Sequence, residues 1–213
     1  MSSKIMSKVY LWMSIGLAIT FITGSMVANN PDALVAIFSN YTPLVLAIAE
    51  IVVVIYLSAR VAKMKPTTAK VLFIVYSILT GLTFSVIFLV YNISSIMTVF
   101  LATALIMFVF AFIGTVTEMD LSKIGTYLFM ALIGIIIVSI INIFVGSSSL
   151  ELAVSIVALI VFVIYIAYDV QNIKYLSETE IPEDNLAIYG ALQLYLDFIN
   201  IFIRLLSLFG KEK

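Results

Sequence analysis

The sequence of 213 residues contains no cysteine and no histidine. Without cysteine, disulfides, thiolate metal sites and cysteine nucleophiles are excluded. Without histidine, any response to pH between about 5 and 8 must come from carboxyl groups in unusual surroundings. Charged residues make up only 11% of the chain and no basic cluster of useful size occurs, so we expect no binding of nucleic acid.

Apolar residues are abundant instead. They make up 63% of the chain, and the mean hydropathy is +1.22. A soluble protein of this size would leave much of that apolar surface in water. A lipid bilayer removes the problem, but it requires helices or closed barrels, because each backbone polar group then needs a partner within the protein.

Seven apolar segments, each about 20 residues long and without strand-like alternation, predict membrane-spanning helices rather than barrel strands. We therefore expect an all-α integral membrane protein, a seven-transmembrane helix bundle. Short links with turn residues join the segments, and none holds a soluble domain, so a single polytopic domain, 1–213, is predicted. The segments are Lys8–Ala28, Pro43–Ala62, Thr67–Val90, Ser94–Thr117, Ile124–Val145, Leu150–Lys174 and Leu186–Phe209.

The distribution of lysine and arginine predicts the orientation. Lys4 and Lys8 precede the first span, and the link between the second and third spans is rich in basic residues, whereas the odd-numbered links have none. These features predict a multi-pass protein of the cell (inner) membrane with a cytoplasmic N-terminus. Seven crossings would then place Lys211 and Lys213 outside, which opposes the rule weakly, so the seventh segment either spans or is re-entrant.

Four charged residues lie away from the ends of the apolar segments: Glu50, Asp169, Asp197 and Arg204. A charge at the centre of a spanning helix costs about 2.5–3.5 kcal/mol, so such residues are candidates for function. Arg60 lies at the end of the second segment, where a simple positive-inside anchor is the alternative interpretation.

The seventh segment carries a polar stripe. Gln193, Asp197, Asn200 and Arg204 follow one another at i, i+4, i+7 and i+11, so they share one face of a helix. Such a face does not suit lipid, and the helix should lie inside the bundle or line water. An ion pair between Asp197 and Arg204 is the alternative, although residues seven apart exceed the usual contact spacing.

The sixth segment repeats the pattern with Tyr165, Asp169 and Asn172. Because the sixth and seventh segments run antiparallel, the depths of Asp169 and Asp197 differ by only about 6 Å at 1.5 Å per residue. The two carboxyl groups can therefore face each other. The alternative is that Asp169 is solvated near the end of its helix.

Two carboxyl groups in a site of low dielectric constant cannot both ionise cheaply, so the pair would share one proton and titrate as a unit. Their oxygens also suit a hard cation such as calcium. The residues thus predict a pH-sensitive cation path, with Asp169 and Asp197 as sensor and calcium ligands.

Several stretches resemble the transmembrane Bax inhibitor motif family, and the short N-terminus is similar to that of its bacterial members. The resemblance covers the second to seventh segments, and "LQLYLDFINIF" is its most specific part. The matching stretches are "YDVQNIK" at Tyr168–Lys174, "LQLYLDFINIF" at Leu192–Phe202, "GTVTEMDLS" at Gly114–Ser122 and "NIF" at Asn142–Phe144.

The resemblance implies six helices around a central C-terminal helix and a calcium leak that pH controls through an aspartate pair. It implies that Asp169 and Asp197 are that pair, that Arg60 latches Asp169, and that Glu50 matches an acidic residue of the second helix. Many relatives have a basic residue where Ser207 stands here, which leaves the role of Arg204 open.

The resulting hypothesis is a pH-sensitive calcium leak channel in which Arg60 holds ionised Asp169 and protonation releases it. Protons also compete with calcium for the same oxygens, so the direction of the response stays open. We expect a monomer in membrane lipid that is not an enzyme and needs no cofactor, with calcium as the permeant ion. The alternatives are a non-catalytic modulator of a membrane quality-control protease, an intramembrane aspartyl protease and a proton-coupled transporter.

Overall fold

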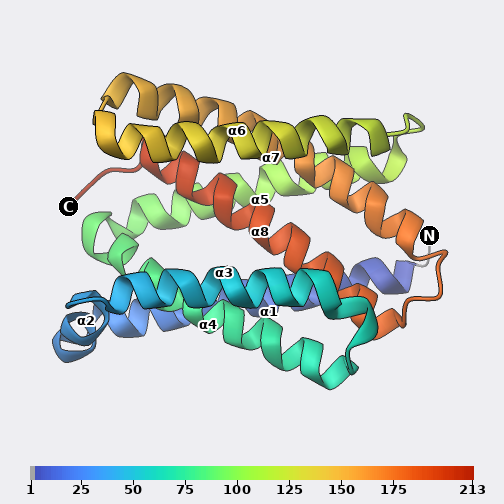
Figure 1. The fold of residues 1–213 in the computed structure, drawn as a ribbon, viewed down its shortest axis with the longest axis horizontal. Helices are drawn as coiled ribbons and strands as arrows, with labels where there is room; N and C mark the ends of the chain where they lie inside the picture. The colour runs from blue at the N-terminus through green and yellow to red at the C-terminus, as the bar shows by residue number, and fades with distance from the viewer. Residues whose placement is uncertain (1–2) are drawn as a thin grey trace. The chain divides into compact units, whose positions relative to one another are not determined.

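The computed structural model describes residues 3–213, and they form α-helices joined by short links (Figure 1). Within residues 3–213 no strand occurs beyond one isolated bridge between Tyr91 and Glu212. The helices are α1 (Ser3–Ala28), α2 (Pro31–Phe38), α3 (Thr42–Arg60), the 3-10 turn η1 (Val61–Lys63), α4 (Pro66–Val90), α5 (Ile93–Val116), α6 (Ser122–Val145), α7 (Ser148–Leu176) and α8 (Glu183–Phe209).

Seven of these helices are long and apolar enough to cross a membrane, with mean hydropathies of 1.6 to 2.9 over a stretch of 18 residues. The all-α membrane bundle predicted from the sequence is confirmed, and α8 is among the seven. The predicted segments agree with the helices to within a few residues, and α1, α4, α6 and α8 end where the sequence predicts.

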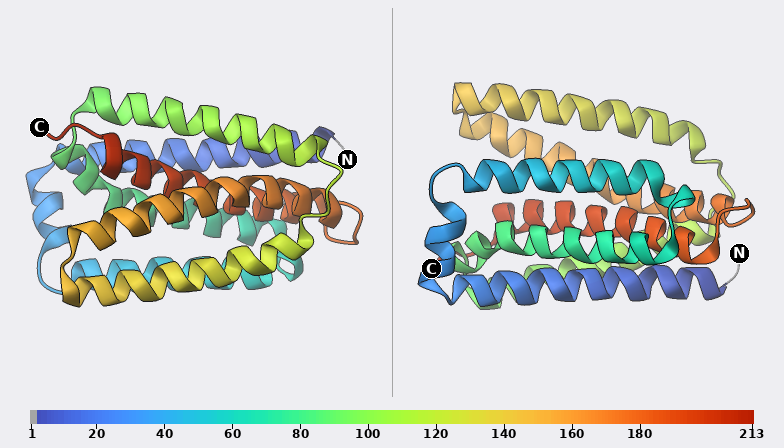
Figure 2. Two further views of the ribbon diagram at one scale, coloured as in Figure 1. Left: turned by 90° about the horizontal axis from the view of Figure 1, so that it is seen from above. Right: turned by 60° about the horizontal axis from the view of Figure 1, so that its bottom comes forward.

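The short helix α2 was not predicted. The link after α1 was expected to be a turn, but Asn30 accepts a hydrogen bond from the N–H of Ala33 at 3.1 Å and Pro31 takes the first helical position, so a helix starts there. Figure 2 shows α2 in the link between α1 and α3. None of its residues is buried, and the side chain of Val35 is 68% exposed.

The chain forms two compact units. Among the described residues, unit 1 contains 3–93, 176–195 and 212–213, and unit 2 contains 94–175 and 196–211. Helix α8 contributes its first half to unit 1 and its second half to unit 2. The prediction of one functional domain over 1–213 stays a prediction.

In unit 1, α1 and α4 pack against the first half of α8 around Tyr195. The ring of Tyr195 meets Phe73 and Tyr76 edge to face at centroid distances of 5.8 and 5.9 Å. Its hydroxyl lies 2.6 Å from Oγ1 of Thr20, which donates to the carbonyl of Ser77 at 2.9 Å. The few polar groups of this apolar core are therefore paired.

Basic residues from separate parts of the chain gather at one end of unit 1. Lys8 of α1 and Lys70 of α4 both contact the carboxylate of Asp184, at 3.0 and 2.7 Å. The side chain of Asn185 donates to the carbonyls of Val61 and Met64 in the α3–α4 link. These links thus lie at one end of unit 1, and the assignment of that end to the cytoplasmic side of a membrane stays a prediction.

In unit 2, α5, α6 and α7 pack with the second half of α8. Helices α6 and α7 form a hairpin (Figure 2), and its turn begins at Gly146, whose φ of +65° favours glycine. Phe100 of α5 packs on Phe198 and Phe202 of α8 at centroid distances of 5.0 and 6.4 Å.

Helix α8 is the most buried of the seven spans. In its best window 72% of the residues are buried, against 11–39% for the others. A helix that carries a polar stripe through a membrane needs this protection. The predicted interior position of the C-terminal helix is confirmed.

Candidate functional site

Asp169 of α7 and Asp197 of α8 lie together in unit 2. Each residue is only 3% exposed, and their carboxyl groups lie close enough to interact with each other. The alternative that Asp169 is solvated at the end of its helix is therefore wrong. The second oxygen of Asp197, Oδ2, has no hydrogen-bond partner among the described residues. The buried pair thus has an acceptor that is not satisfied, which is unusual inside a protein.

Helices α5 and α6 approach α7 closely beside Asp169, because they present glycines there. A Cβ atom at Gly114 of α5 would lie 2.4 Å from the carbonyl oxygen of Ala167. A Cβ atom at Gly125 of α6 would lie 2.3 Å from the ring of Tyr168. Since Ala167 and Tyr168 are the two residues before Asp169 on α7, the two glycines let α5 and α6 pack next to the carboxyl group.

Gln171 ties the link between α5 and α6 to α7. Its Oε1 accepts from the N–H of Leu121 and its Nε2 donates to the carbonyl of Met119, both at 2.8 Å. The side-chain amide of Gln171 therefore makes two hydrogen bonds to the segment 119–121, one as acceptor and one as donor. This clamp lies about half a helical turn beyond Asp169 and holds the link next to the carboxyl pair.

Tyr165 and Asn172 lie one turn before and one turn after Asp169 on α7, and both are half-buried. Tyr165 packs its ring against Phe162 and Tyr168 at 6.1 Å, and its hydroxyl is close enough to interact electrostatically with both aspartates. Tyr165 is therefore part of the surroundings of the pair, as the helical spacing predicts.

The remaining residues of the α8 stripe are half-buried and divide between the units. Gln193 lies in unit 1. In unit 2, Asn200 donates to the carbonyl of Leu196 at 2.8 Å, and Arg204 donates to Oγ of Ser155 at 3.3 Å. Arg204 also interacts electrostatically with Glu151 of α7. Among the described residues it forms no ion pair with Asp197, so the alternative of a structural ion pair along α8 is wrong.

Glu50 and Arg60 both belong to α3 in unit 1. Glu50 is half-buried, and its Oε1 accepts a hydrogen bond of 2.9 Å from the hydroxyl of Thr83 on α4. Arg60 is exposed at the last position of α3. The role of Arg60 as a latch stays a prediction.

Comparison with known proteins shows to which family the chain belongs. The family described as "Inhibitor of apoptosis-promoting Bax1" matches residues 2–213. The chain is 42% identical to the inner membrane protein YbhL of Escherichia coli K12, over 98% of this chain and 92% of that protein. It is 38% identical to an uncharacterized protein of Borreliella burgdorferi, over 99% and 93%. The chain belongs to the Bax inhibitor family.

The sequence stretches that resemble the Bax inhibitor family surround the carboxyl pair. "YDVQNIK" contains Asp169 and the clamp residue Gln171, and "LQLYLDFINIF" contains Tyr195 and Asp197. "GTVTEMDLS" contains Gly114 and the link that Gln171 holds. In unit 2 the family stretches on α5, α7 and α8 thus supply both carboxyl groups and several of the residues next to Asp169, although Gly125 lies outside them.

Sequence reasoning did not single out Gln171, Thr20 or Asp184. Gln171 lies in "YDVQNIK", one of the stretches that resemble the family. Its place in that stretch could have identified it as a candidate site residue. The contacts of Thr20 and Asp184 join residues 175 and 176 positions apart in the sequence. No spacing pattern along the chain reports contacts over such separations.

Proposed function

We propose that this member of the Bax inhibitor family is a passive calcium leak whose conductance depends on protonation of the Asp169–Asp197 pair. The observation that carries the proposal is that two carboxyl groups, each 3% exposed, lie close enough to interact. Ionisable residues buried within membrane-spanning helices mark ion paths and proton relays more often than they stabilise a fold.

A proton shared by the pair would join the two groups by a hydrogen bond, which two ionised carboxylates cannot form because both only accept. Loss of that proton would leave two negative charges at hydrogen-bonding distance with little water around them. The repulsion is relieved when the helices separate or when a cation binds. Protonation is thereby coupled to the position of α7 and α8 or to cation entry.

Calcium suits the pair as a permeating ion rather than a resident one. It takes six to eight oxygen ligands, and two carboxylates supply at most four. No group of three or more acidic, histidine or cysteine side chains that could hold a metal occurs among residues 3–213. Weak binding supports conduction, because an ion that is held too firmly does not leave.

The resemblance to the family supports Arg60 as the latch of ionised Asp169. With the latch intact, protonation of the pair releases Arg60, and flux should rise as the pH falls. Competition between protons and calcium acts in the opposite direction. Arg60→Ala removes the latch and leaves only the competition between protons and calcium. The calcium flux of this variant should therefore rise as the pH rises.

Calcium uptake into protein-loaded vesicles that contain a calcium-sensitive dye, measured over a pH series, tests the proposal. We expect a pH-dependent flux in the wild type and a changed pH profile in Asp197→Asn, which keeps the size of the side chain but cannot ionise. Glu180→Gln, a change at an exposed residue of the α7–α8 link, is the matched control and should leave the profile unchanged. A flat wild-type profile would refute the sensor.

An intramembrane aspartyl protease also needs two aspartates on neighbouring helices. We therefore consider this function as a second candidate. Leu196 precedes Asp197, however, and the sequence contains neither Gly-x-Gly-Asp nor Pro-Ala-Leu. Our proposal is therefore not enzymatic. Incubation with a helical membrane reporter substrate should yield no cleavage, and cleavage that Asp169→Asn abolishes would favour the protease instead.

A further inference from the structure

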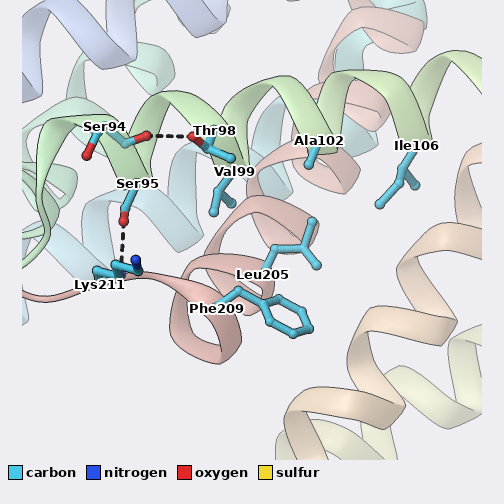
Figure 3. A pocket seen from close by; sticks show the side chains of 9 residues that line it. All are labelled: Ser94, Ser95, Thr98, Val99, Ala102, Ile106, Leu205, Phe209 and Lys211. Atoms are coloured by element: carbon cyan, nitrogen blue, oxygen red, sulfur yellow. Dashed lines mark hydrogen bonds between the residues drawn. The ribbon is translucent and has the colours of Figure 1, made fainter.

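A groove of about 500 Å³ lies in unit 2 between the first half of α5 and the C-terminal end of α8 (Figure 3). Its volume falls within the range of about 300–1,000 Å³ that is typical of small-molecule sites. Its lining residues are Ser94, Ser95, Thr98, Val99, Ala102, Ile106, Leu205, Phe209 and Lys211. All of them belong to unit 2, and none of them takes part in the carboxyl pair.

One end of the groove is polar. Ser95 and Lys211 meet there, and the backbone N–H of Lys211 donates to Oγ of Ser95 at 3.0 Å (Figure 3). Because Ser95 accepts this bond, its own proton remains for another acceptor. No acidic residue lines the groove or stands in the first turn of α5. This end of the groove therefore complements an anion.

The rest of the groove is apolar. Val99, Ala102 and Ile106 line it along α5, and Leu205 and Phe209 line it along α8. Phe209 is 70% exposed, so the groove opens to the surroundings of the protein. In a membrane-spanning helix, those surroundings are lipid.

The length of the groove fits one leaflet of a bilayer. Ser94 is the second residue of α5, so the polar end lies where this span begins. From Ser94 to Ile106 the helix rises by about 18 Å at 1.5 Å per residue. Half of a hydrocarbon core of about 30 Å is about 15 Å. The groove thus runs from the headgroup level to near the middle of the membrane.

We propose that this groove binds a phospholipid with an anionic headgroup. The phosphate contacts Lys211 and the hydroxyl of Ser95, and one acyl chain lies against Val99, Ala102 and Ile106. Lysine near the membrane surface attracts anionic lipids, and the apolar groove adds acyl-chain contact that a soluble anion cannot make. The site does not depend on the calcium path, so either proposal can fail alone.

Native mass spectrometry of the purified full-length protein, titrated with phosphatidylglycerol or phosphatidylcholine, tests the site. We expect phosphatidylglycerol to bind about fivefold more tightly, the factor that one lysine at a membrane surface contributes. Lys211→Gln should remove this preference. Lys123→Gln, a change at an exposed lysine that begins α6, should retain it. Equal preference in the wild type and in Lys211→Gln would overturn the proposal.

A second pair of variants tests the acyl chain. Ala102→Trp fills the groove and should abolish tight binding of both lipids, whereas Leu101→Trp places the same ring on α5 outside the groove and should bind like the wild type. Inorganic phosphate should not displace bound phosphatidylglycerol. Displacement by phosphate, or unchanged lipid binding in Ala102→Trp, would mean that no lipid site of this kind exists.

Discussion

Tyr195 shows how a single residue is held inside unit 1. It is 0% exposed, and its hydroxyl lies 2.6 Å from that of Thr20 across a sequence separation of 175 residues. Because water does not reach this position, the hydroxyl depends on protein partners for its hydrogen bonds.

We predict that Tyr195→Phe lowers the free energy of unfolding by about 0.6 to 1.5 kcal/mol, because it removes this hydrogen bond and keeps the ring. Thr20 retains its bond to the carbonyl of Ser77. Thermal unfolding in detergent micelles measures the effect. The control is Tyr175→Phe, at a residue that is 70% exposed and should not change the stability. Equal effects of the two changes would contradict the assigned role of Thr20.

Asp120 lies outside the membrane spans, just before α6. The hydroxyl of Ser122, and then its backbone N–H at 3.0 Å, hold the pKa of Asp120 below its ordinary value. Since the pKa is lower in the folded state, the carboxylate stabilises the fold above its unfolded pKa, and this contribution disappears as the pH falls through the folded pKa.

Ser122→Ala should therefore move the pKa of Asp120 up toward its ordinary value. Carbon-13 NMR of the Asp120 carboxyl group over a pH series measures this shift. Ser149→Ala, at an exposed residue near the start of α7, should leave the titration of Asp120 in place. An unchanged titration in Ser122→Ala would show that the hydroxyl does not hold the carboxylate.

At the scale of helices, two glycines of unit 2 differ in their surroundings. A Cβ atom at Gly114 of α5 would meet the backbone of Ala167 at 2.4 Å, whereas a Cβ atom at Gly134 of α6 would meet nothing within 4 Å. The first glycine permits the approach of α5 to α7, and the second has no packing role.

Gly114→Ala should cost about 1–3 kcal/mol of stability or more, because a backbone atom cannot move aside as a side chain can. Gly134→Ala should be neutral or stabilise by up to about 1 kcal/mol through helix propensity. Unfolding of both variants in mixed micelles compares them directly. A loss at Gly134 as large as that at Gly114 would contradict the close approach of α5 and α7.

The spans and the carboxyl pair could be predicted from the sequence for physical reasons. Apolar runs of 20 residues have few alternatives to spanning helices, and antiparallel neighbours place Asp169 and Asp197 at similar depths. Helix α2 was missed because eight residues are too few for a span, although Asn30 and Pro31 are start signals. The clamp of Gln171 depends on how α7 is rotated toward the Met119–Leu121 link, which helical spacing alone does not define.

At the scale of the whole molecule, the account requires seven crossings, with the two ends of the chain on opposite sides. The sequence has no cysteine, so single-cysteine variants carry one thiol each. In intact cells, a membrane-impermeant maleimide should label Ser148→Cys and Lys213→Cys. Lys4→Cys and Glu180→Cys should react only after permeabilisation. All four residues are exposed. Labelling of positions 4 and 213 from the same side would show that α8 does not cross.

In the proposed mechanism, one proton on the buried carboxyl pair controls the calcium flux. Infrared spectroscopy of the protein in vesicles detects a protonated carboxyl group, and the difference between the wild type and Asp169→Asn/Asp197→Asn isolates the pair from Glu50 and other acids. We predict that this difference band disappears over the same pH range in which the calcium flux of the wild type changes. A band that titrates elsewhere, or no difference band at any pH, would contradict the account.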